Sequence, residues 1–307
     1  MFRVVRALVT GATGFVGGRL ARELASRGVE VRAMVRDRSR ASDLAEEGFE
    51  LHEGDVSKPE SLRGAGRDCD VAYYLIHGMG RGSEGDFEQQ EREAATAFAK
   101  MAKEEGVERV IYLGGLGDEP KSKHLRSRHE SARCLARHGP ALTYFRAAMV
   151  VGSESESYKT LRYLVERLPA MIAPGWLKTP TQPIAAEDVL AYLGQAPEIE
   201  ESAGREIQIG GPDVVTYAEM LDHMARALGK RPRPKLPVPF LTPKLSSRWI
   251  GFVTPVDAGV ARPLVEGLST RTVVTDPTGM SLFDVKPVGI DTALEHAIEG
   301  ERSRAAA

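Results

Sequence analysis

Cysteine and long apolar runs are scarce in this chain. Its 307 residues include two cysteines, Cys69 and Cys134, too few for a disulfide framework, which favours a reducing compartment such as the cytoplasm. No apolar run reaches the roughly 18 residues that a membrane-spanning helix needs, and no secretory signal precedes the first apolar segment. A net charge of −2 gives no reason to expect a nucleic-acid partner. The histidines are scattered and show no metal-ligand spacing, so we expect no metal site. Together with the low cysteine content, these features lead us to expect a cytoplasmic protein.

A glycine-rich stretch near the amino terminus is the strongest motif. Residues 4–18 read VVRALVTGATGFVGG, an apolar run that predicts a buried parallel strand, then a turn, then a predicted helix. Gly11 allows a sharp exit from the strand, Gly14 lets a pyrophosphate approach the backbone, and Gly17 lets the helix pack on the sheet. The alternative is a tight turn without a ligand. In this context we predict a dinucleotide site formed by Gly11, Ala12, Thr13, Gly14, Phe15 and Val16.

The loop after the next predicted strand indicates which nucleotide binds. A carboxylate at that strand's end would accept hydrogen bonds from the adenosine ribose and repel a 2′-phosphate, but here Val35 is followed by RDRSR. Arg36 and Arg38 favour a 2′-phosphate, and therefore NADP(H) over NAD(H). The alternative is a solvated basic loop in which Asp37 serves a ribose hydroxyl.

Further nucleotide contacts are expected where the following strands end. Asp55 is placed to meet the adenine amino group, to signal a helix over 57–62, or to do both. His77 follows a predicted strand over 70–76 and either lies near the nicotinamide ribose or makes loop hydrogen bonds. We expect contacts from Asp55, Val56, Leu75, Ile76, His77 and Gly114.

Alternating apolar and amphipathic segments predict an α/β fold, a Rossmann-type doubly wound parallel sheet with a smaller carboxyl-terminal α+β region. We expect residues 1–150 to form the NAD(P)-binding domain, 181–210 to return to it, and 151–307 to form a smaller substrate or cap region. Beyond the turn, strands are predicted at 107–113, 142–145 and 206–210, helices at 87–106, 158–168, 187–193 and 216–228, and a short strand and turn at 175–180.

Several motifs together resemble the short-chain dehydrogenase/reductase superfamily. They are TGATGFVG, YYLIHGMG, YLGGLG, HLRSRHE, LVERLP and TPTQPIAAEDVLAYL. The details are most similar to the atypical NmrA-like group and to bacterial NAD(P)-binding proteins of the epimerase/dehydratase-like kind. The resemblance covers most of the chain and is looser beyond Ala196.

The resemblance implies a catalytic tyrosine, a lysine four residues later, and a serine or threonine at the end of the fifth strand. In this chain His124 stands at the tyrosine position, Arg128 at the lysine position, and glycines at 114 and 115 replace the hydroxyl residue. Arg128 keeps a positive charge with which to bind a ribose or phosphate. His124 is a candidate acid or base, because an ordinary histidine pKa is about 6.5. The nearby Ser122 and Ser127 are hydroxyl candidates or turn and cap residues.

Two functions follow from the resemblance. The first is an NADP(H)-dependent oxidoreductase or epimerase/dehydratase-type enzyme acting on a small organic substrate. The second, suggested by the missing tyrosine–lysine pair, is a dinucleotide-sensing or scaffold protein, as some NmrA-like proteins and an accessory subunit of respiratory complex I are.

The carboxyl-terminal part is less informative. By family analogy the substrate pocket lies between it and the ends of the fourth and fifth strands, where Trp176, Lys178 and Gln182 either line the pocket or serve as core and turn residues. From its sequence, the proline-rich segment 231–263 could form an interfacial membrane element, a homodimer contact or a lid on the pocket. Its prolines interrupt any long helix, so we prefer a packed cap.

Overall fold

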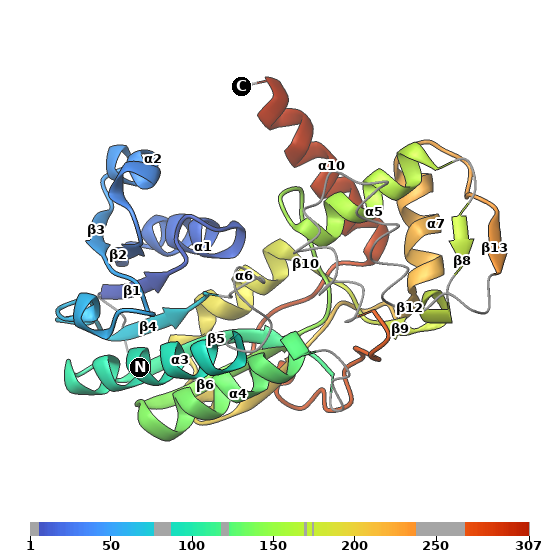
Figure 1. Cartoon of the computed structure of the whole chain (residues 1–307). Coiled ribbons are helices and arrows are strands. Elements are labelled where there is room, and N and C mark those ends of the chain that lie inside the picture. Colours follow the sequence, from blue (N-terminus) through green and yellow to red (C-terminus); the bar gives the residue numbers. More distant parts are fainter. Residues whose placement is uncertain are drawn as a thin grey trace.

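The computed structural model describes residues 6–76, 87–117, 123–168, 171–173, 175–237 and 268–306. Seven parallel strands form the central sheet in the order β11-β6-β5-β4-β1-β2-β3 (Figure 1). They are β1 (Arg6–Thr10), β2 (Glu30–Val35), β3 (Glu50–Glu53), β4 (Val71–Tyr74), β5 (Arg109–Gly115), β6 (Ala141–Ala147) and β11 (Glu206–Ile209). The strand order reverses between β1 and β4, which is where doubly wound sheets bind ligands. The predicted Rossmann-type α/β fold is confirmed.

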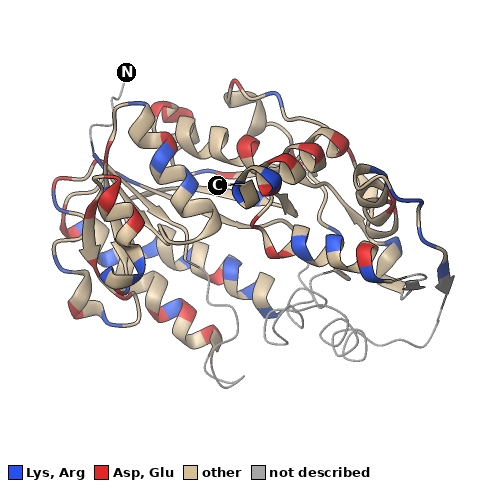
Figure 2. Ribbon diagram, turned by 90° about the horizontal axis from the view of Figure 1, so that it is seen from above, with Lys and Arg blue, Asp and Glu red and all other residues tan. Residues whose placement is uncertain are grey.

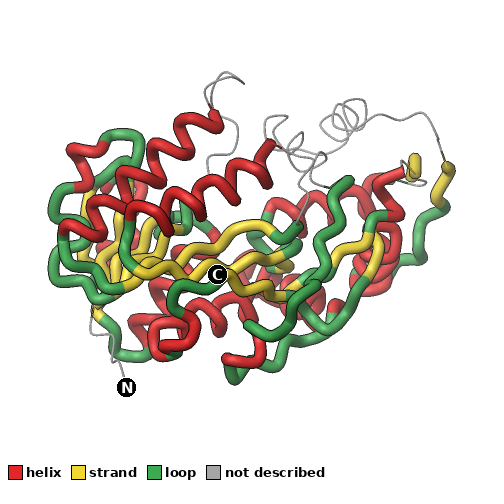
Figure 3. Tube along the Cα trace, turned by 90° about the horizontal axis from the view of Figure 1, so that it is seen from below, coloured by secondary structure: helices red, strands yellow, loops and turns green. Residues whose placement is uncertain are grey.

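Helices cover both faces of this sheet (Figure 3). Val9 of β1 belongs to one apolar cluster together with residues of α1 (Phe15–Ser26) and α6 (Ala186–Gln195). Leu8, its neighbour in the strand, belongs to another cluster together with residues of α3 (Phe87–Glu104) and α4 (Lys123–His138). Successive side chains of a strand point to opposite faces. The centre of the first strand, Ala7–Val9, is therefore apolar on both faces because both are covered.

A second group of helices packs around its own apolar cluster. It consists of α5 (Glu156–Arg167), α7 (Tyr217–Ala227) and α10 (Ile290–Ala306). Thr216 and Glu219 form a capping box at the amino end of α7. Three short strand pairs complete this part: β7 (Val150–Val151) with β10 (Ile184–Ala185), β9 (Pro180–Thr181) with β12 (Val215–Thr216), and β8 (Met171–Ala173) with β13 (Lys235–Pro237).

The remaining elements are short. They are α2 (Ser42–Glu46) and the 3-10 helices η1 (Arg38–Ala41), η2 (Pro59–Leu62), η3 (Gly175–Lys178), η4 (Ala196–Glu198), η5 (Glu200–Ser202) and η6 (Met280–Leu282). Two expectations need correction here. The segment 175–180, predicted as a short strand and turn, is a 3-10 helix followed by β9, and the predicted helix over 57–62 is only the 3-10 turn η2.

The surface is of mixed charge. Basic and acidic residues are interspersed along the helices (Figure 2), and the net charge of the chain is −2. In the part of the chain that the structure describes, no helix combines the length and the apolarity needed to cross a membrane. Residues 238–263 of the proline-rich segment lie outside the described residues, so its predicted role as a cap stays a prediction.

Candidate functional site

The glycine turn lies where the carboxyl ends of β1 and β4 meet the amino end of α1. Gly11 has a φ of +65°, and a Cβ atom there would lie 2.7 Å from the carbonyl oxygen of Leu75. A Cβ atom on Gly17 would lie 2.3 Å from the carbonyl oxygen of Gly11. The hydroxyl of Thr10 donates to the carbonyl oxygen of Tyr73 (3.0 Å) and accepts from the amide of Leu75 (2.9 Å). Only glycine therefore fits at positions 11 and 17.

The amino end of α1 offers uncommitted backbone donors. Its N-cap is Gly14, and among the described residues no side chain caps this end and no acidic residue lies in its first turn. Thr13 and Gly14 are exposed, whereas Ala12 is buried. Unpaired N–H groups and the positive end of the helix dipole form an anion site. The turn therefore has the chemistry to hold a pyrophosphate.

The side chain of Phe15 is engaged by the protein itself. A Cβ atom on Gly152 would lie 2.5 Å from its ring, and the guanidinium of Arg19 lies 5.0 Å from the ring centroid. Val16 packs against the cluster that α1 shares with the sheet. At both positions the main chain is thus the part left to meet a nucleotide.

The loop after β2 is basic, and its single carboxylate is occupied. Asp37 accepts hydrogen bonds from the amide (2.9 Å) and the hydroxyl (2.6 Å) of Ser39, and these bonds lower the pKa of Asp37. Arg38 donates to the carbonyl oxygen of Leu51 (2.8 Å). Arg36 is exposed and has no hydrogen bond or ion pair with another described residue. Of these side chains, Arg36 is the one available to a 2′-phosphate.

Asp55 lies after β3 and forms its own turn. Its carboxylate accepts from the amide (2.9 Å) and the hydroxyl (2.7 Å) of Ser57. Partial burial opposes ionisation, but these hydrogen bonds and the charge of Arg36 outweigh it and lower the pKa of Asp55. Because Ser57 is used in this way, the following 3-10 helix begins only at Pro59. The side chain of Val56 is buried in the cluster that contains residues of α3 and α4.

The end of β5 has no room for the hydroxyl residue that the family would place there. A Cβ atom on Gly114 would lie 2.7 Å from the ring of Tyr144. On Gly115 it would lie 2.4 Å from Leu125 and 3.5 Å from the guanidinium of Arg128. The ring of Tyr144 therefore leaves no room for a side chain at Gly114, whereas the contact at Gly115 is with the flexible end of Leu125, and the guanidinium of Arg128 lies beside Gly115.

His124 is half-buried, and its ring lies 4.8 Å from that of Phe87, the first residue of α3.

His77 lies outside the described residues, so its predicted role is untested. Leu75 and Ile76 lie beside Gly11. The structure thus gathers the glycine turn, the end of β4 and the end of β5 at one edge of the sheet, and it sets the basic loop and Asp55 beside one another.

One polar pair at this edge, His129 and Tyr144, was not predicted from the sequence. The Nε2 of His129 lies 3.1 Å from the carbonyl oxygen of Gly117, and its Nδ1 lies 3.1 Å from the hydroxyl of Tyr144. Because a carbonyl only accepts, Nε2 carries the proton and Nδ1 accepts from the tyrosine. Burial and the positive charge of Arg146 lower the pKa of His129, which keeps it neutral, and burial raises the pKa of Tyr144. The pair depends on how α4, which carries His129, packs on β6, which carries Tyr144.

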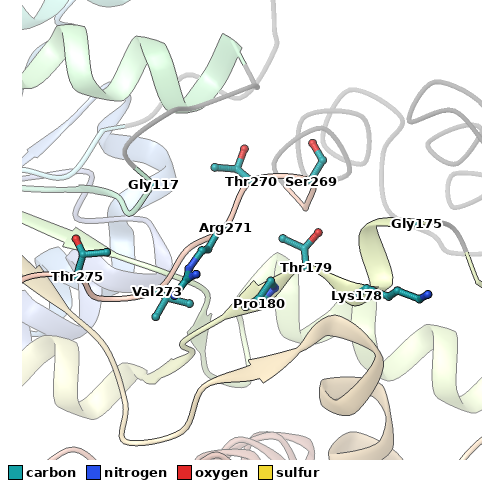
Figure 4. A pocket seen from close by; sticks show the side chains of 10 residues that line it. All are labelled: Gly117, Gly175, Lys178, Thr179, Pro180, Ser269, Thr270, Arg271, Val273 and Thr275. Atoms are coloured by element: carbon teal, nitrogen blue, oxygen red, sulfur yellow. The ribbon is translucent and has the colours of Figure 1, made fainter.

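A cavity of about 430 Å³ opens beside Gly117. Figure 4 shows Thr275 and Val273 at one end of its lining, Lys178 at the other, and Arg271 between them. The full lining is Gly117, Gly175, Lys178, Thr179, Pro180, Ser269, Thr270, Arg271, Val273 and Thr275. Of the two roles left open for Lys178, pocket residue and turn residue, the structure thus shows that it lines a pocket.

The other two predicted pocket residues are held elsewhere. Trp176 packs edge-to-face on Tyr217, with 6.1 Å between ring centroids. Gln182 donates to the carbonyl oxygen of Gly211 (2.7 Å) and accepts from the amide of Val274 (2.9 Å). Both therefore support the wall of the cavity from behind.

Comparison with known proteins supports the nucleotide assignment. Residues 11–155 match the model of a family described as NAD(P)H-binding. In sequence, the chain is 28% identical over 290 residues to the mitochondrial NADH dehydrogenase [ubiquinone] 1 alpha subcomplex subunit 9 of Arabidopsis thaliana, over 88% of this chain and 71% of that protein.

Solved structures share the fold. Triphenylmethane reductase of Citrobacter sp. complexed with NADP(H) has a TM-score of 0.76 at 18% identity, covering 95% of this chain and 99% of that one. The NADPH-dependent quinone oxidoreductase QOR2 of Escherichia coli has a TM-score of 0.72 at 18% identity, with the same coverage of 95% and 99%. The predicted resemblance to atypical short-chain dehydrogenases/reductases is confirmed, and the chain has an NAD(P)H-binding domain.

Proposed function

We propose that this NAD(P)-binding protein takes NADP(H) at the amino end of α1 and uses it to reduce a small organic substrate in the cavity beside Gly117. The observation that carries the proposal is the position of the cavity. Gly117 lies two residues after the end of β5, so the cavity adjoins the same carboxyl edge of the sheet as the glycine turn. In open α/β sheets, ligands bind outside this edge.

The basic loop supports NADP(H) over NAD(H). Asp37, the carboxylate that could have served a ribose hydroxyl, is bound to Ser39. Arg36 has a free guanidinium, whose planar fork matches a phosphate. A bound 2′-phosphate would therefore gain a cationic partner, without displacing an existing ion pair.

A bound nicotinamide supplies the hydride. The chain then has to hold the nucleotide and deliver a proton. We assign the first task to the turn Gly11–Val16 and to Arg128, which lies against Gly115 and has donors for a ribose hydroxyl. We assign the second to His124, at the amino end of α4.

The proposal includes two further parts. One is the division into a nucleotide-binding region (1–150, with 181–210) and a substrate or cap region (151–307). The other is a cytoplasmic location with a homodimer or a peripheral membrane contact formed by residues 231–263. Chains truncated at these boundaries, size measurement in solution and vesicle sedimentation test these parts separately.

Turnover tests the reaction. The protein is mixed with NADPH and, in turn, a quinone and a triphenylmethane dye, the acceptors suggested by the two structural neighbours. We expect NADPH oxidation that is lost in His124→Ala and Arg128→Ala, while both variants remain folded. If both variants turn over like the parent protein, the assigned site is wrong.

A second function is favoured by the end of β5. The ring of Tyr144 fills the space over Gly114, which leaves no room there for the hydroxyl residue of the family. The similarity to a subunit of NADH dehydrogenase [ubiquinone], over 88% of this chain and 71% of that protein, points the same way. This function is a nucleotide-dependent structural or sensing role. It predicts tight NADPH binding, a large difference in affinity between NADP⁺ and NADPH, and no turnover with any acceptor.

A further inference from the structure

The cavity beside Gly117 has a distinct charge character. Its described lining contains two cationic side chains, Arg271 and Lys178, and no carboxylate. Neither cation forms a hydrogen bond or an ion pair with another described residue. Among the described residues, the carboxylate nearest to the lining in sequence is Asp276, which accepts from the amide (2.9 Å) and the hydroxyl (2.6 Å) of Thr278. The positive charge of the lining is therefore uncompensated by the described part of the chain.

The backbone that carries Arg271 is fixed on its carboxyl side. The amide of Thr272 donates to the carbonyl oxygen of Pro180 (3.2 Å), and its own carbonyl accepts from the amide of Gln182 (2.8 Å). The hydroxyl of Thr272 donates to that of Thr181 (2.8 Å), and both threonines are buried. A side chain held on such a backbone has less freedom to lose when a ligand binds, which favours affinity.

The opposite wall is fixed as well. Gly117 has a φ of +133°, and a Cβ atom there would lie 2.9 Å from the side chain of Thr270. Its carbonyl oxygen is held by His129, which is in turn hydrogen-bonded to Tyr144 on β6. The cavity is thus bounded on one side by a segment held to β9 and on the other by Gly117, which His129 links to β6, and Arg271 extends toward the Val273 end of the cavity (Figure 4).

We infer, building on the proposed reduction, that the substrate is an organic anion, and that Arg271 binds its phosphate or carboxylate group. A guanidinium presents two parallel N–H donors to such a group, and this pairing is stronger than a neutral hydrogen bond. The volume of about 430 Å³ accommodates an organic body together with the anionic group. Lys178, at the far end of the cavity, adds long-range attraction to the same ligand.

The test uses phenyl phosphate and its two halves, inorganic phosphate and phenol. The full-length protein is first saturated with NADPH, so that the dinucleotide site is filled, and each probe is then titrated by calorimetry. We expect phenyl phosphate to bind at least about 10-fold more tightly than either half, since both the anion and the apolar ring contribute. We also expect its affinity to fall with added salt.

Variants locate the binding. Arg271→Gln should weaken phenyl phosphate about 10-fold or more and leave NADPH affinity unchanged, while Arg231→Gln, at an exposed arginine outside the cavity, should change neither. The inference would be overturned if Arg271→Gln bound phenyl phosphate as tightly as the parent protein does. It would also be overturned if inorganic phosphate or phenol bound as tightly as phenyl phosphate, or if phenyl phosphate did not bind. If NADPH itself does not bind, the proposed function fails, and the same titration without nucleotide still tests the cavity.

Discussion

Replacing Arg36 by alanine tests the nucleotide preference at a single side chain. Arg36 is exposed and forms no hydrogen bond or ion pair with another described residue, so its removal takes away only its electrostatic effect on Asp55. A hydrogen bond between charged groups contributes about 1.5–3 kcal/mol, and solvent exposure places this one at the lower end. About 1.5 kcal/mol corresponds to roughly a 10-fold loss of affinity. The loss should apply to NADP⁺ and NADPH and not to NAD⁺ and NADH, which lack the 2′-phosphate.

The assay is calorimetric titration of each nucleotide into the parent protein and the variant. Arg38→Ala should cost less, because the Arg38 guanidinium already donates to the carbonyl oxygen of Leu51 (2.8 Å). Arg231→Ala, at an exposed arginine beyond α7, is the matched control and should have no effect. An equal loss for the phosphorylated and unphosphorylated nucleotides, or none for either, would refute the assignment of Arg36 to a 2′-phosphate.

Three other substitutions probe the site. Gly17→Ala places a Cβ atom 2.3 Å from the carbonyl oxygen of Gly11. Urea denaturation should therefore show a free energy of unfolding lower by about 1–3 kcal/mol. An unchanged denaturation midpoint would contradict the close packing at Gly17. Gly114→Ser restores the family hydroxyl but places a Cβ atom 2.7 Å from the ring of Tyr144. This variant should lose a similar amount of stability and gain no turnover. A variant as stable as the parent protein and more active would disprove the clash. Burial and a nearby positive charge lower the pKa of His129 in the folded state from 6.5, so the unfolded chain binds the proton more readily and stability should decline as pH falls below about 6.5. His129→Gln should flatten that part of the pH profile, and an identical profile would exclude His129 as its source.

The fold and the nucleotide turn were predictable because they depend on local patterns. A continuous apolar strand, a glycine turn and an amphipathic helix specify one another over a short stretch of chain, and the crowded Cβ positions at Gly11 and Gly17 explain why glycine is needed there. The predicted helix over 57–62 was wrong because Asp55 uses Ser57 in a local turn, a side-chain bond that competes with helix formation.

The cavity and the polar pair beside it were not predictable, because they join distant parts of the chain. His129 meets Tyr144 only through the packing of α4 on β6, and Arg271 reaches the end of β5 because Thr272 is hydrogen-bonded to the segment after η3. No short-range pattern marks either contact. Lys178 was identified as a pocket residue from family analogy alone, and the same analogy gave no sign of Arg271.

The central claim is that the glycine turn binds NADP(H), and calorimetric titration of NADP⁺, NADPH, NAD⁺ and NADH into the purified protein tests it most directly. We predict measurable binding, with both phosphorylated nucleotides at least about 10-fold tighter than their unphosphorylated counterparts. Tighter binding of NAD⁺ and NADH would contradict the assignment of NADP(H). Binding of none of the four would contradict the assignment of the turn itself.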